Sequence, residues 1–412
     1  MCKGGHSLML STPLQATEII TQHLFRLPSE DCGIDFAHGR VLREPISADR
    51  PMPAYDRVTM DGYAVNCAAW QGEPPTSLNV AGFQGAGMMA QTLADDDSAI
   101  EIATGAVLPH GADAVVPYEE TAKDGTRITL SAPTEISPGK SIHPRGSDFA
   151  AGTELVAAGT QLTGREIAVA ATVGAARVRV ASRPSVAIVT TGDELMDVSA
   201  PSITPYQIRR SNDYALRAAL AQSHLINRIE RFHLRDHREE IESSLRSILA
   251  EYDMVVLTGG VSKGKRDHVP EVLAELGAVE RLRGIAQRPG KPLWFGTTPR
   301  QTPIFALPGN PVSTYVCLHR YVLPALRAMA GLPNSPTETV LLGEPFAFDR
   351  PLAFMLPVVL QSTPEGQQIA APAPFNTSGD IGGLLGTDGF VELPADQSNF
   401  AKGTAVRLWR WT

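Results

Sequence analysis

The chain has 412 residues, of which 43% are hydrophobic and 19% charged, and its formal net charge is -8. This length exceeds the roughly 100 to 200 residues of an ordinary domain, so several domains are expected. The acidic balance disfavours a nucleic-acid-binding protein, which usually carries a basic surface. No segment approaches the roughly 20 apolar residues that cross a bilayer, and the N-terminus does not resemble a signal peptide. We therefore expect no nucleic-acid partner, no membrane and a cytoplasmic location.

The cysteines agree with that location. They are scattered along the chain as Cys2, Cys32, Cys67 and Cys317. None belongs to a C-x-x-C pair, so neither a zinc site nor a disulfide framework is indicated.

The first 182 residues predict two small domains, one of which interrupts the other. A capping box followed by an amphipathic run starts a helix at Thr12. Short apolar stretches punctuated by Gly, Pro and Asp then favour a small β domain over residues 49–145. A second capping box starts a helix at Thr163. We expect residues 7–48 and 146–182 to form one discontinuous, elongated domain.

The next part of the chain, residues 183–332, has a different pattern. The apolar runs SVAIVTT, DMVVLT, KPLWFG and TPIFAL predict buried parallel strands, and helical patterns lie between the first three. This alternation predicts a doubly wound sheet. Short strands and turns over residues 333–412 predict a C-terminal β-barrel. The predicted fold class is therefore α/β multidomain, with one doubly wound parallel-sheet domain, small β domains and the discontinuous elongated N-terminal domain.

Glycine turns follow strands of the predicted sheet in TTGDEL, TGGVSKGKRD and LPGNPVS. In open parallel sheets, ligands bind beyond the carboxyl ends of the strands, where backbone amides and helix N-termini face an anion. In the third turn, Asn310 can cap a helix and Pro311 can occupy its first position, which leaves N–H groups for phosphate. Alone, that turn is better explained as a plain tight turn. The coincidence of all three favours a shared ligand site.

The second turn fits a nucleotide-binding P-loop until its last position. Gly259, Gly264 and Lys265 match, but Arg266 stands where Ser or Thr would reach magnesium. From Lys263 to Lys291 the chain holds seven cations against four acids. This local excess suggests a small anionic ligand, although a solvated basic face explains it equally well.

Carboxylates at strand ends suggest a metal site. Asp193, Glu194 and Asp267 can meet around one divalent cation, and oxygen ligands favour magnesium. The alternatives are structural: Asp267 can cap the helix that follows it, and Asp236 can cap another helix with Glu239 closing a box. There is no H-E-x-x-H and no G-x-S-x-G in the sequence. The residues alone therefore favour metal-assisted phosphoryl chemistry.

Together these segments resemble a known family, the MoeA-type molybdopterin molybdenumtransferases, which also occur as a domain of gephyrin. The resemblance runs in order through RVLREPISADRPMPAYDRVTMDGYAV, EIATGAVLPHGADAVVPYEE, RRSN, TTGDEL, LTGGVSKGKRDHV, QRPGKPLWFG, LPGNPVS and NTSGDIGGLLGTDGFVELP. It implies a homodimer of four-domain subunits with a MogA-like sheet domain that binds molybdopterin. It also implies that adenylated molybdopterin and molybdate are the substrates, that Mg2+ is required and that AMP is released.

The resemblance further implies roles for individual residues. The implied catalytic residues are Asp61, Thr104, Glu194, Asp236 and Asp267, of which Glu194 and Asp267 would bind the metal. The implied substrate-binding residues are Gly192, Asp193, Ser211, Asn212, Gly259, Gly260, Ser262, Lys263, Gly264, Arg283, Arg288, Lys291, Pro308, Gly309, Asn310, Pro311 and Ser313. In the family the β domain of one subunit faces the sheet domain of its partner, so the resemblance implies shared sites and an inactive monomer.

Some positions depart from the family pattern. Lys263 and Lys265 replace a small apolar residue and an acid found in many members, and Arg288 replaces a lysine. These changes keep or increase positive charge, so anion binding is still expected. Two alternatives remain open, namely a non-catalytic binding or scaffold module and a molybdopterin adenylyltransferase. Retained acids argue against the first, and the additional β domains argue against the second.

Overall fold

The computed structural model describes residues 10–70, 77–130, 136–260, 268–333, 337–373 and 376–411. Contacts divide the chain into two compact units. The sheet unit comprises Met1–Arg43, Gly159–Thr163 and Arg177–Thr412, and the β-domain unit comprises Glu44–Ala158 and Gly164–Ala176. Each unit contains parts of more than one predicted domain, so the division into four domains stays a prediction. No helix in the described part of the chain is long and apolar enough to span a membrane.

The sheet unit begins with helix α1 (Pro13–Gln22). Thr12 accepts a hydrogen bond from the Gln15 backbone, and the Gln15 side chain accepts one from Thr12, which confirms the predicted capping box. After this helix, β1 (Ser29–Gly33) pairs antiparallel with β12 (Arg177–Ala181). The chain therefore leaves the sheet unit and returns to it beside its own starting strand.

A six-stranded sheet in the order β16-β13-β17-β21-β20-β18 forms the centre of this unit. Its strands are β13 (Ser185–Thr191), β16 (Arg228–Leu234), β17 (Met254–Thr258), β18 (Val279–Arg283), β20 (Trp294–Thr297) and β21 (Pro303–Leu307). β13 is parallel to β16 and to β17, and β17 is parallel to β21. β20 is antiparallel to both β21 and β18.

The orientation of β20 corrects the prediction that KPLWFG forms a parallel strand. A tight hairpin connects β20 to β21, in which Thr298 N donates to Thr302 O at 3.1 Å. A parallel pair needs a crossover of roughly a dozen residues, so this short connection permits only antiparallel pairing. The edge strands β16 and β18 were not predicted, because their sequences RIERFHL and VERLR carry charged residues instead of a continuous apolar run.

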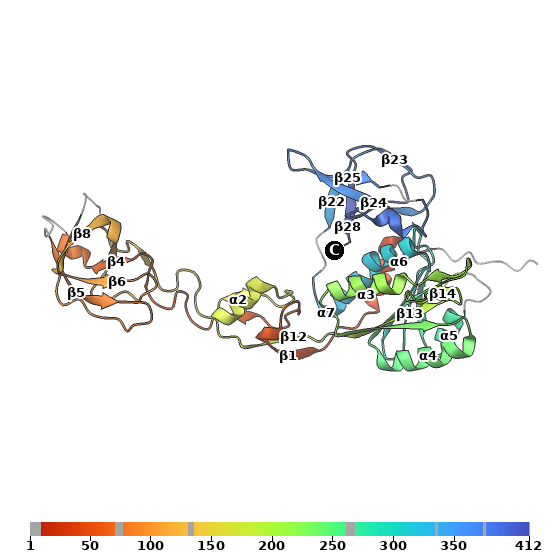
Figure 1. Cartoon of the computed structure of the whole chain (residues 1–412), viewed down its shortest axis with the longest axis horizontal. Helices are drawn as coiled ribbons and strands as arrows, with labels where there is room; N and C mark the ends of the chain where they lie inside the picture. Colours follow the sequence, from red (N-terminus) through yellow and green to blue (C-terminus); the bar gives the residue numbers. More distant parts are fainter. Residues whose placement is uncertain are drawn as a thin grey trace, which may run out of the picture. The chain divides into compact units, whose positions relative to one another are not determined.

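Helices cover both faces of the sheet, which confirms the doubly wound arrangement. α3 (Asn212–Gln222) and α6 (Pro311–Cys317) lie on one face, and α4 (Arg238–Glu251) and α5 (Val269–Glu275) on the other (Figure 1). Alternate residues of β13 join different cores: Ile188 packs in the cluster that contains Leu216 of α3, and Val189 in the cluster that contains Leu245 of α4. A strand buried on both faces reads as an unbroken apolar run, which is why the sequence revealed β13 clearly.

The C-terminal strands close into a five-stranded barrel in the order β24-β25-β22-β28-β26, with β26 pairing back to β24. The strands are β22 (Glu338–Leu342), β24 (Ala353–Ser362), β25 (Gln368–Pro372), β26 (Gly389–Leu393) and β28 (Ala405–Arg410). A short strand from before the barrel, β19 (Gln287–Arg288), pairs in parallel with β24. Two-stranded ribbons join β14 (Leu195–Met196) to β15 (Ile208–Arg209) and β23 (Phe346–Ala347) to β27 (Asn399–Phe400).

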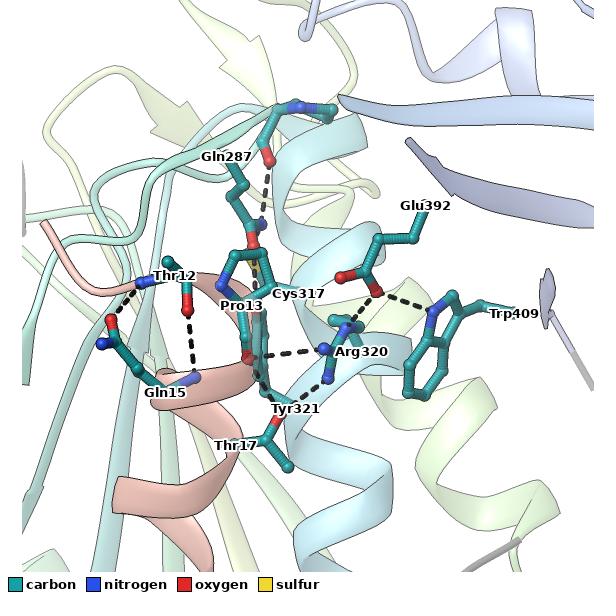
Figure 2. Close-up of polar contacts among 11 residues, drawn as sticks. Thr12, Pro13, Gln15, Thr17, Gln287, Cys317, Arg320, Tyr321, Glu392 and Trp409 are labelled. Carbon is teal, nitrogen blue, oxygen red and sulfur yellow. Dashed lines mark hydrogen bonds and ion pairs between the residues drawn. The ribbon is translucent and has the colours of Figure 1, made fainter. Parts of the chain in front are cut away.

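A buried ion pair links the barrel to the helices of the sheet unit (Figure 2). α6 continues through a π-helical turn, η4 (Leu318–Val322), into α7 (Leu323–Ala330). Arg320 of η4 is 2% exposed and donates to Glu392 of β26 at 2.9 Å and to Thr17 of α1 at 2.8 Å. Trp409 Nε1 donates to the same Glu392 carboxylate at 3.0 Å. Because each polar group has a partner, this charge can be buried without leaving an uncompensated ion.

The β-domain unit contains a second six-stranded sheet, in the order β7-β4-β6-β5-β9-β8. Its strands are β4 (Gly62–Val65), β5 (Leu78–Gln84), β6 (Ser98–Ile102), β7 (Ala114–Pro117), β8 (Thr121–Asp124) and β9 (Arg127–Leu130). The unit also contains the pairs β2 (Ile46–Ser47) with β11 (Glu154–Val156) and β3 (Arg57–Val58) with β10 (Ile142–His143), and helix α2 (Gly164–Thr172). Short 3-10 turns in the chain are η1 (Ile34–Phe36), η2 (Cys67–Trp70), η3 (Tyr118–Glu120) and η5 (Ile381–Leu384).

Candidate functional site

The glycine turns come together beyond the carboxyl ends of the central strands. We call this end of the strands the sheet edge. The turns follow β13, β17 and β21, which are neighbouring parallel strands, so their carboxyl ends share an edge. Gly259 N, after β17, donates to Leu307 O at the end of β21 at 3.4 Å. A Cβ on Gly309 would lie 3.7 Å from Gly259 Cα, so the second and third turns are in direct contact.

The first two glycines of the second turn have no room for a side chain. Gly259 and Gly260 have φ values of 92° and 67°. A Cβ on Gly259 would lie 2.7 Å from Thr191 O, and one on Gly260 would lie 2.7 Å from Thr191 Oγ1 and 2.8 Å from Val269 Cγ2. The Thr191 hydroxyl is buried and has no hydrogen-bond partner among the residues that the structure describes. The turn therefore lies tightly against the end of β13, beside an unused polar atom.

Asn212 connects the turns through its side-chain amide. Its Nδ2 lies 2.9 Å from Thr258 Oγ1, 2.7 Å from Gly309 O and 3.3 Å from Thr314 Oγ1. Thr258 Oγ1 also donates to Pro308 O at 3.1 Å. The Asn212 amide group therefore holds the second and third turns together and places their backbone groups. Its expected role in substrate binding stays a prediction.

The third turn differs from its prediction in one respect. Pro311 does occupy the first position of α6, but the Asn310 side chain makes no capping hydrogen bond. Instead, Asn310 Nδ2 donates to Ser378 Oγ at 2.7 Å, and the Val312 N–H donates to Ser378 O at 3.0 Å. The expected cap is therefore wrong. The segment that contains Ser378 takes up the side chain and one helix N–H that were expected to be available for phosphate.

Acidic residues lie at the end of β13. Asp193 and Glu194 are exposed, and the Asp193 carboxylate accepts from Asp236 N at 3.2 Å. The Glu194 carboxylate folds back over Gly192, where a Cβ would lie 2.8 Å from its nearest oxygen. The structural alternative for Asp236 is wrong, because α4 begins at Arg238 with His237 in the capping position. The structure thus brings Asp193 and Asp236 together.

The basic candidates occupy two places. Arg283 ends β18 opposite Trp294, which in turn pairs with Ala306 near the end of β21, so Arg283 is at the same sheet edge as the turns. Its guanidinium is paired with Glu280 at 2.7 Å. Arg288 and Lys291 are exposed and lie in the Q-R-P-G-K turn.

Buried side chains hold the Q-R-P-G-K turn in place. Gln287 is fully buried, and its Nε2 donates to Pro289 O at 2.9 Å while Tyr321 OH donates to its Oε1 (Figure 2). A Cβ on Gly290, where φ is 98°, would lie 2.6 Å from Cys317 Sγ. The turn that presents Arg288 and Lys291 therefore packs directly on α6.

Other candidates are placed as follows. Ser211 is exposed and immediately precedes α3, whereas Ser313 is buried within α6 at 4% exposure. Four predicted residues, Ser262, Lys263, Gly264 and Asp267, lie outside the described residues. The proposed capping role of Asp267 and its metal role are therefore still predictions.

Asp61 and Thr104 lie together in the β-domain unit. The Asp61 carboxylate accepts a hydrogen bond from Thr104 N at 2.7 Å, and both residues are exposed. Tyr118 N donates to Asp61 O at 3.2 Å, and Tyr118 OH donates to Glu101 at 3.0 Å. Burial, followed by the hydrogen bond to Glu101, raises the pKa of Tyr118 to about 12, so it stays a phenol at neutral pH. Lys123 pairs with the same Glu101 carboxylate at 2.8 Å.

The carboxylate oxygens at the sheet edge are the type of ligand that magnesium prefers. Mg2+ usually binds one or two carboxylates, retains several waters and contacts substrate phosphates, so a complete cage of protein ligands is not needed. Glu194 and Asp193 are exposed carboxylates beside the turns. In the described ranges, no three His, Cys, Asp or Glu side chains are grouped closely enough to hold a metal by themselves.

Several residues of the sheet edge were not predicted from the sequence. Thr258 and Thr314 are buried at 2% exposure and complete the bonds around Asn212. Ser378 lies in N-T-S-G-D, within a segment that resembles the family, but the resemblance implies no role for it. A strand-end threonine beside a glycine turn is a signal that could have identified Thr258. The contact of Ser378 with α6 depends on how the barrel packs, so no local pattern indicates it.

Comparison with known proteins covers nearly the whole chain. The MoeA N-terminal region (domain I and II) matches residues 12–174, a probable molybdopterin binding domain matches 187–328, and the MoeA C-terminal region (domain IV) matches 339–411. The molybdopterin molybdenumtransferase of Synechocystis sp. is 37% identical over 398 residues, which cover 96% of this chain and 98% of that protein. That of Staphylococcus epidermidis is 30% identical over 405 residues, which cover 96% and 95%. A molybdopterin biosynthesis MoeA protein from Pyrococcus horikoshii superimposes with a TM-score of 0.82 at 25% identity, covering 98% of this chain and all of that one.

Proposed function

This chain belongs to the MoeA family of molybdopterin molybdenumtransferases, and we propose that it inserts molybdate into adenylated molybdopterin with release of AMP, the final step of molybdenum cofactor biosynthesis. The observation that carries this proposal is the sheet edge, where turns after β13, β17 and β21 meet and Asn212 holds two of them together. Backbone amides in such turns suit the pyrophosphate link of an adenylate.

The described side chains have distinct tasks in this reaction. Arg288 and Lys291 balance the charge of the bound substrate from the Q-R-P-G-K turn. Glu194 and Asp193 would hold Mg2+ at the sheet edge, and Asp267, which lies outside the described residues, would join them. Magnesium supplies charge neutralisation on the phosphate oxygens when the link is cleaved. Asp61 and Thr104 act from the β domain, where their mutual hydrogen bond fixes the carboxylate.

The decisive experiment measures AMP release from adenylated molybdopterin by the purified protein, with Mg2+, in the presence and absence of molybdate. We expect molybdate-dependent release, with molybdenum recovered on the dithiolene product. Tight binding of the adenylate without release would support a binding or scaffold module instead. Formation of the adenylate from ATP and molybdopterin would support an adenylyltransferase, the other alternative.

We also propose that the enzyme is a homodimer whose sites are shared between subunits. The support is that candidate residues lie in two separate units, Asp61 and Thr104 in one and Glu194 and Asp236 in the other. Two impaired variants, Asp61→Asn and Asn212→Ala, should then show more activity when mixed than either shows alone. Random heterodimers would contain one intact site each, so activity should recover to up to about one quarter of wild type. Mixing without recovery, despite confirmed subunit exchange, would argue that each site belongs to one chain.

The cytoplasm is the compartment that we propose for this reaction. Cys32, Cys67 and Cys317 are free thiols buried in the structure. Thiols without disulfides are usual in a reducing compartment. Fractionation of cells that produce the protein at its natural level would test this location.

A further inference from the structure

A cavity separate from the sheet edge opens where the barrel meets the helices of the sheet unit. Its volume is about 530 Å³. We call it the C-terminal cavity and define it by Arg327 of α7, His319 of η4, and Arg407, Trp409 and Trp411 at the end of the chain. This volume lies in the range of roughly 300 to 1,000 Å³ that is usual for small-molecule sites.

Two arginines of the cavity have no acidic partner among the described residues of its lining. Arg410 also lines it, but that side chain is paired with Glu338, the one carboxylate in the described lining. No hydrogen bond or ion pair joins the guanidinium of Arg327 or Arg407 to another described residue. Burial lowers the pKa of both groups below the usual arginine value, although both remain charged at neutral pH. Two half-buried guanidinium groups therefore have donors available for an oxyanion.

Aromatic rings form another part of the lining. Arg407 stacks over the Trp409 ring, with its Cζ 4.2 Å from the ring centroid. The Trp409 indole N–H is bound to Glu392 (Figure 2), and that of Trp411 donates to Thr387 at 2.8 Å. Because their N–H groups are already satisfied, both indoles offer the cavity apolar surface. The guanidinium of Arg320 also lies over the Trp409 ring, 4.3 Å from its centroid, so a ligand would meet this indole at its edge. Edge-to-face contact with an indole suits a flat ring.

From this lining, we propose that the C-terminal cavity binds a small phosphorylated compound that also carries a flat heterocyclic ring. The arginines receive the phosphate, since a guanidinium fork matches phosphate oxygens, and the indoles receive the ring. The cavity is a ligand site in addition to the sheet edge, and this inference does not depend on the reaction proposed there.

The test is a titration of the full-length protein with AMP, which contains both chemical features, followed by tryptophan fluorescence. We expect saturable quenching that Trp411→Phe largely removes. Arg327→Ala and Arg407→Ala should each weaken AMP binding about tenfold or more, because each deletes a charge-assisted hydrogen bond. Arg246→Ala is the matched control, since Arg246 forms a surface ion pair with Glu242 on α4, and it should bind like wild type. Adenosine and ribose 5-phosphate, which each lack one feature, should both bind more weakly than AMP.

Arg407→Lys keeps the charge while removing the fork, and it separates recognition from misfolding. We expect it to retain the wild-type melting temperature and still weaken AMP binding. Quenching of Trp411 that is unchanged in both alanine variants, or absent at millimolar AMP, would overturn the proposal. Dissociation of an oligomer by Arg327→Ala in sedimentation experiments would also overturn it, because the cavity would then be a contact between copies of the chain.

Discussion

The two groups of candidate residues are held in place by different means. At the sheet edge, hydrogen bonds of Asn212 and of the buried Thr258 fix the backbone of the turns. In the β-domain unit, Asp61 and Thr104 are exposed and share one hydrogen bond of 2.7 Å. The first arrangement positions peptide groups, and the second positions side chains. Substitutions at the sheet edge should therefore lower stability and activity together, whereas those at Asp61 should lower activity alone.

The largest effect should come from Gly260→Ala. The new methyl group would overlap Thr191 Oγ1 and Val269 in a backbone conformation with φ of 67°. We expect the free energy of unfolding to fall by about 3 kcal/mol or more. AMP release should fall at least about a hundredfold, because a displaced turn misplaces the substrate. Chemical denaturation and AMP release measure the two effects.

Gly366→Ala is the control for this substitution. Gly366 has φ of 82°, but nothing lies within 4 Å of its added Cβ. It should cost only the left-handed backbone penalty, about 1 to 2 kcal/mol, and leave AMP release unchanged. Equal losses in the two variants would show that conformation alone, and not the close contact with β13, requires glycine at position 260.

Asp61→Asn should separate activity from stability. Asparagine keeps an oxygen that can accept from Thr104 N, and the position is exposed. The free energy of unfolding should change by less than about 0.5 kcal/mol. AMP release should fall about a hundredfold, the usual contribution of a positioned ionisable group. Retained turnover in a folded variant would mean that the carboxylate charge has no part in the reaction.

Asn212→Ala should have an intermediate effect on both quantities. It removes the hydrogen bonds to Thr258 Oγ1 and Gly309 O, and each such bond contributes about 0.5 to 1.5 kcal/mol to stability. Activity should fall about tenfold as the turns loosen. Asn310→Ala is the matched variant, because its exposed amide has one partner, Ser378. A larger loss of stability in Asn310→Ala than in Asn212→Ala would contradict the connecting role of Asn212.

The smallest expected effect is a pH dependence of stability that originates at His319. Burial lowers the pKa of His319 to about 4, well below its value in an unfolded chain. Between these pKa values the unfolded state binds more protons, so stability falls as the pH falls from about 6.5 towards 4. Each pH unit in this window should cost up to about 1.4 kcal/mol. Denaturation of wild type and His319→Gln at pH 6 and pH 5 should show a shallower slope in the variant, and equal slopes would exclude His319 as the source.

In the central sheet, the strands that the sequence predicted are those buried on both sides. β13, β17 and β21 appear as unbroken apolar runs, and their shared edge follows from parallel pairing. The orientation of β20 was missed because an apolar run indicates burial but not direction. The short hairpin to β21 determines that direction, and its length was present in the sequence.

For the candidate site, the sequence predicted the positions of residues along the strands but not the partners of their side chains. Glycine spacing indicated turns, and chain order placed Asp193, Glu194 and Asp236 at strand ends. The partner of a polar side chain was harder to predict, since it depends on contacts between distant segments. Asn310 has the local sequence of a helix cap but binds Ser378, 68 residues away, because the barrel places a competing hydroxyl beside it. Similarly, nothing local indicates that Asn212 serves Thr258 and Gly309.

The pairing of β19 with β24 affects how the chain can be divided for experiments. Gln287 and Arg288 hydrogen-bond along a barrel strand although they precede the barrel in sequence. A recombinant fragment that ended near residue 333 would therefore leave β19 without its neighbour β24. The side of the Q-R-P-G-K turn that normally faces β24 would be exposed to solvent. A barrel expressed alone would lose the strand beside β24. The break between the matched regions at 187–328 and 339–411 is thus a poor place to cut the gene.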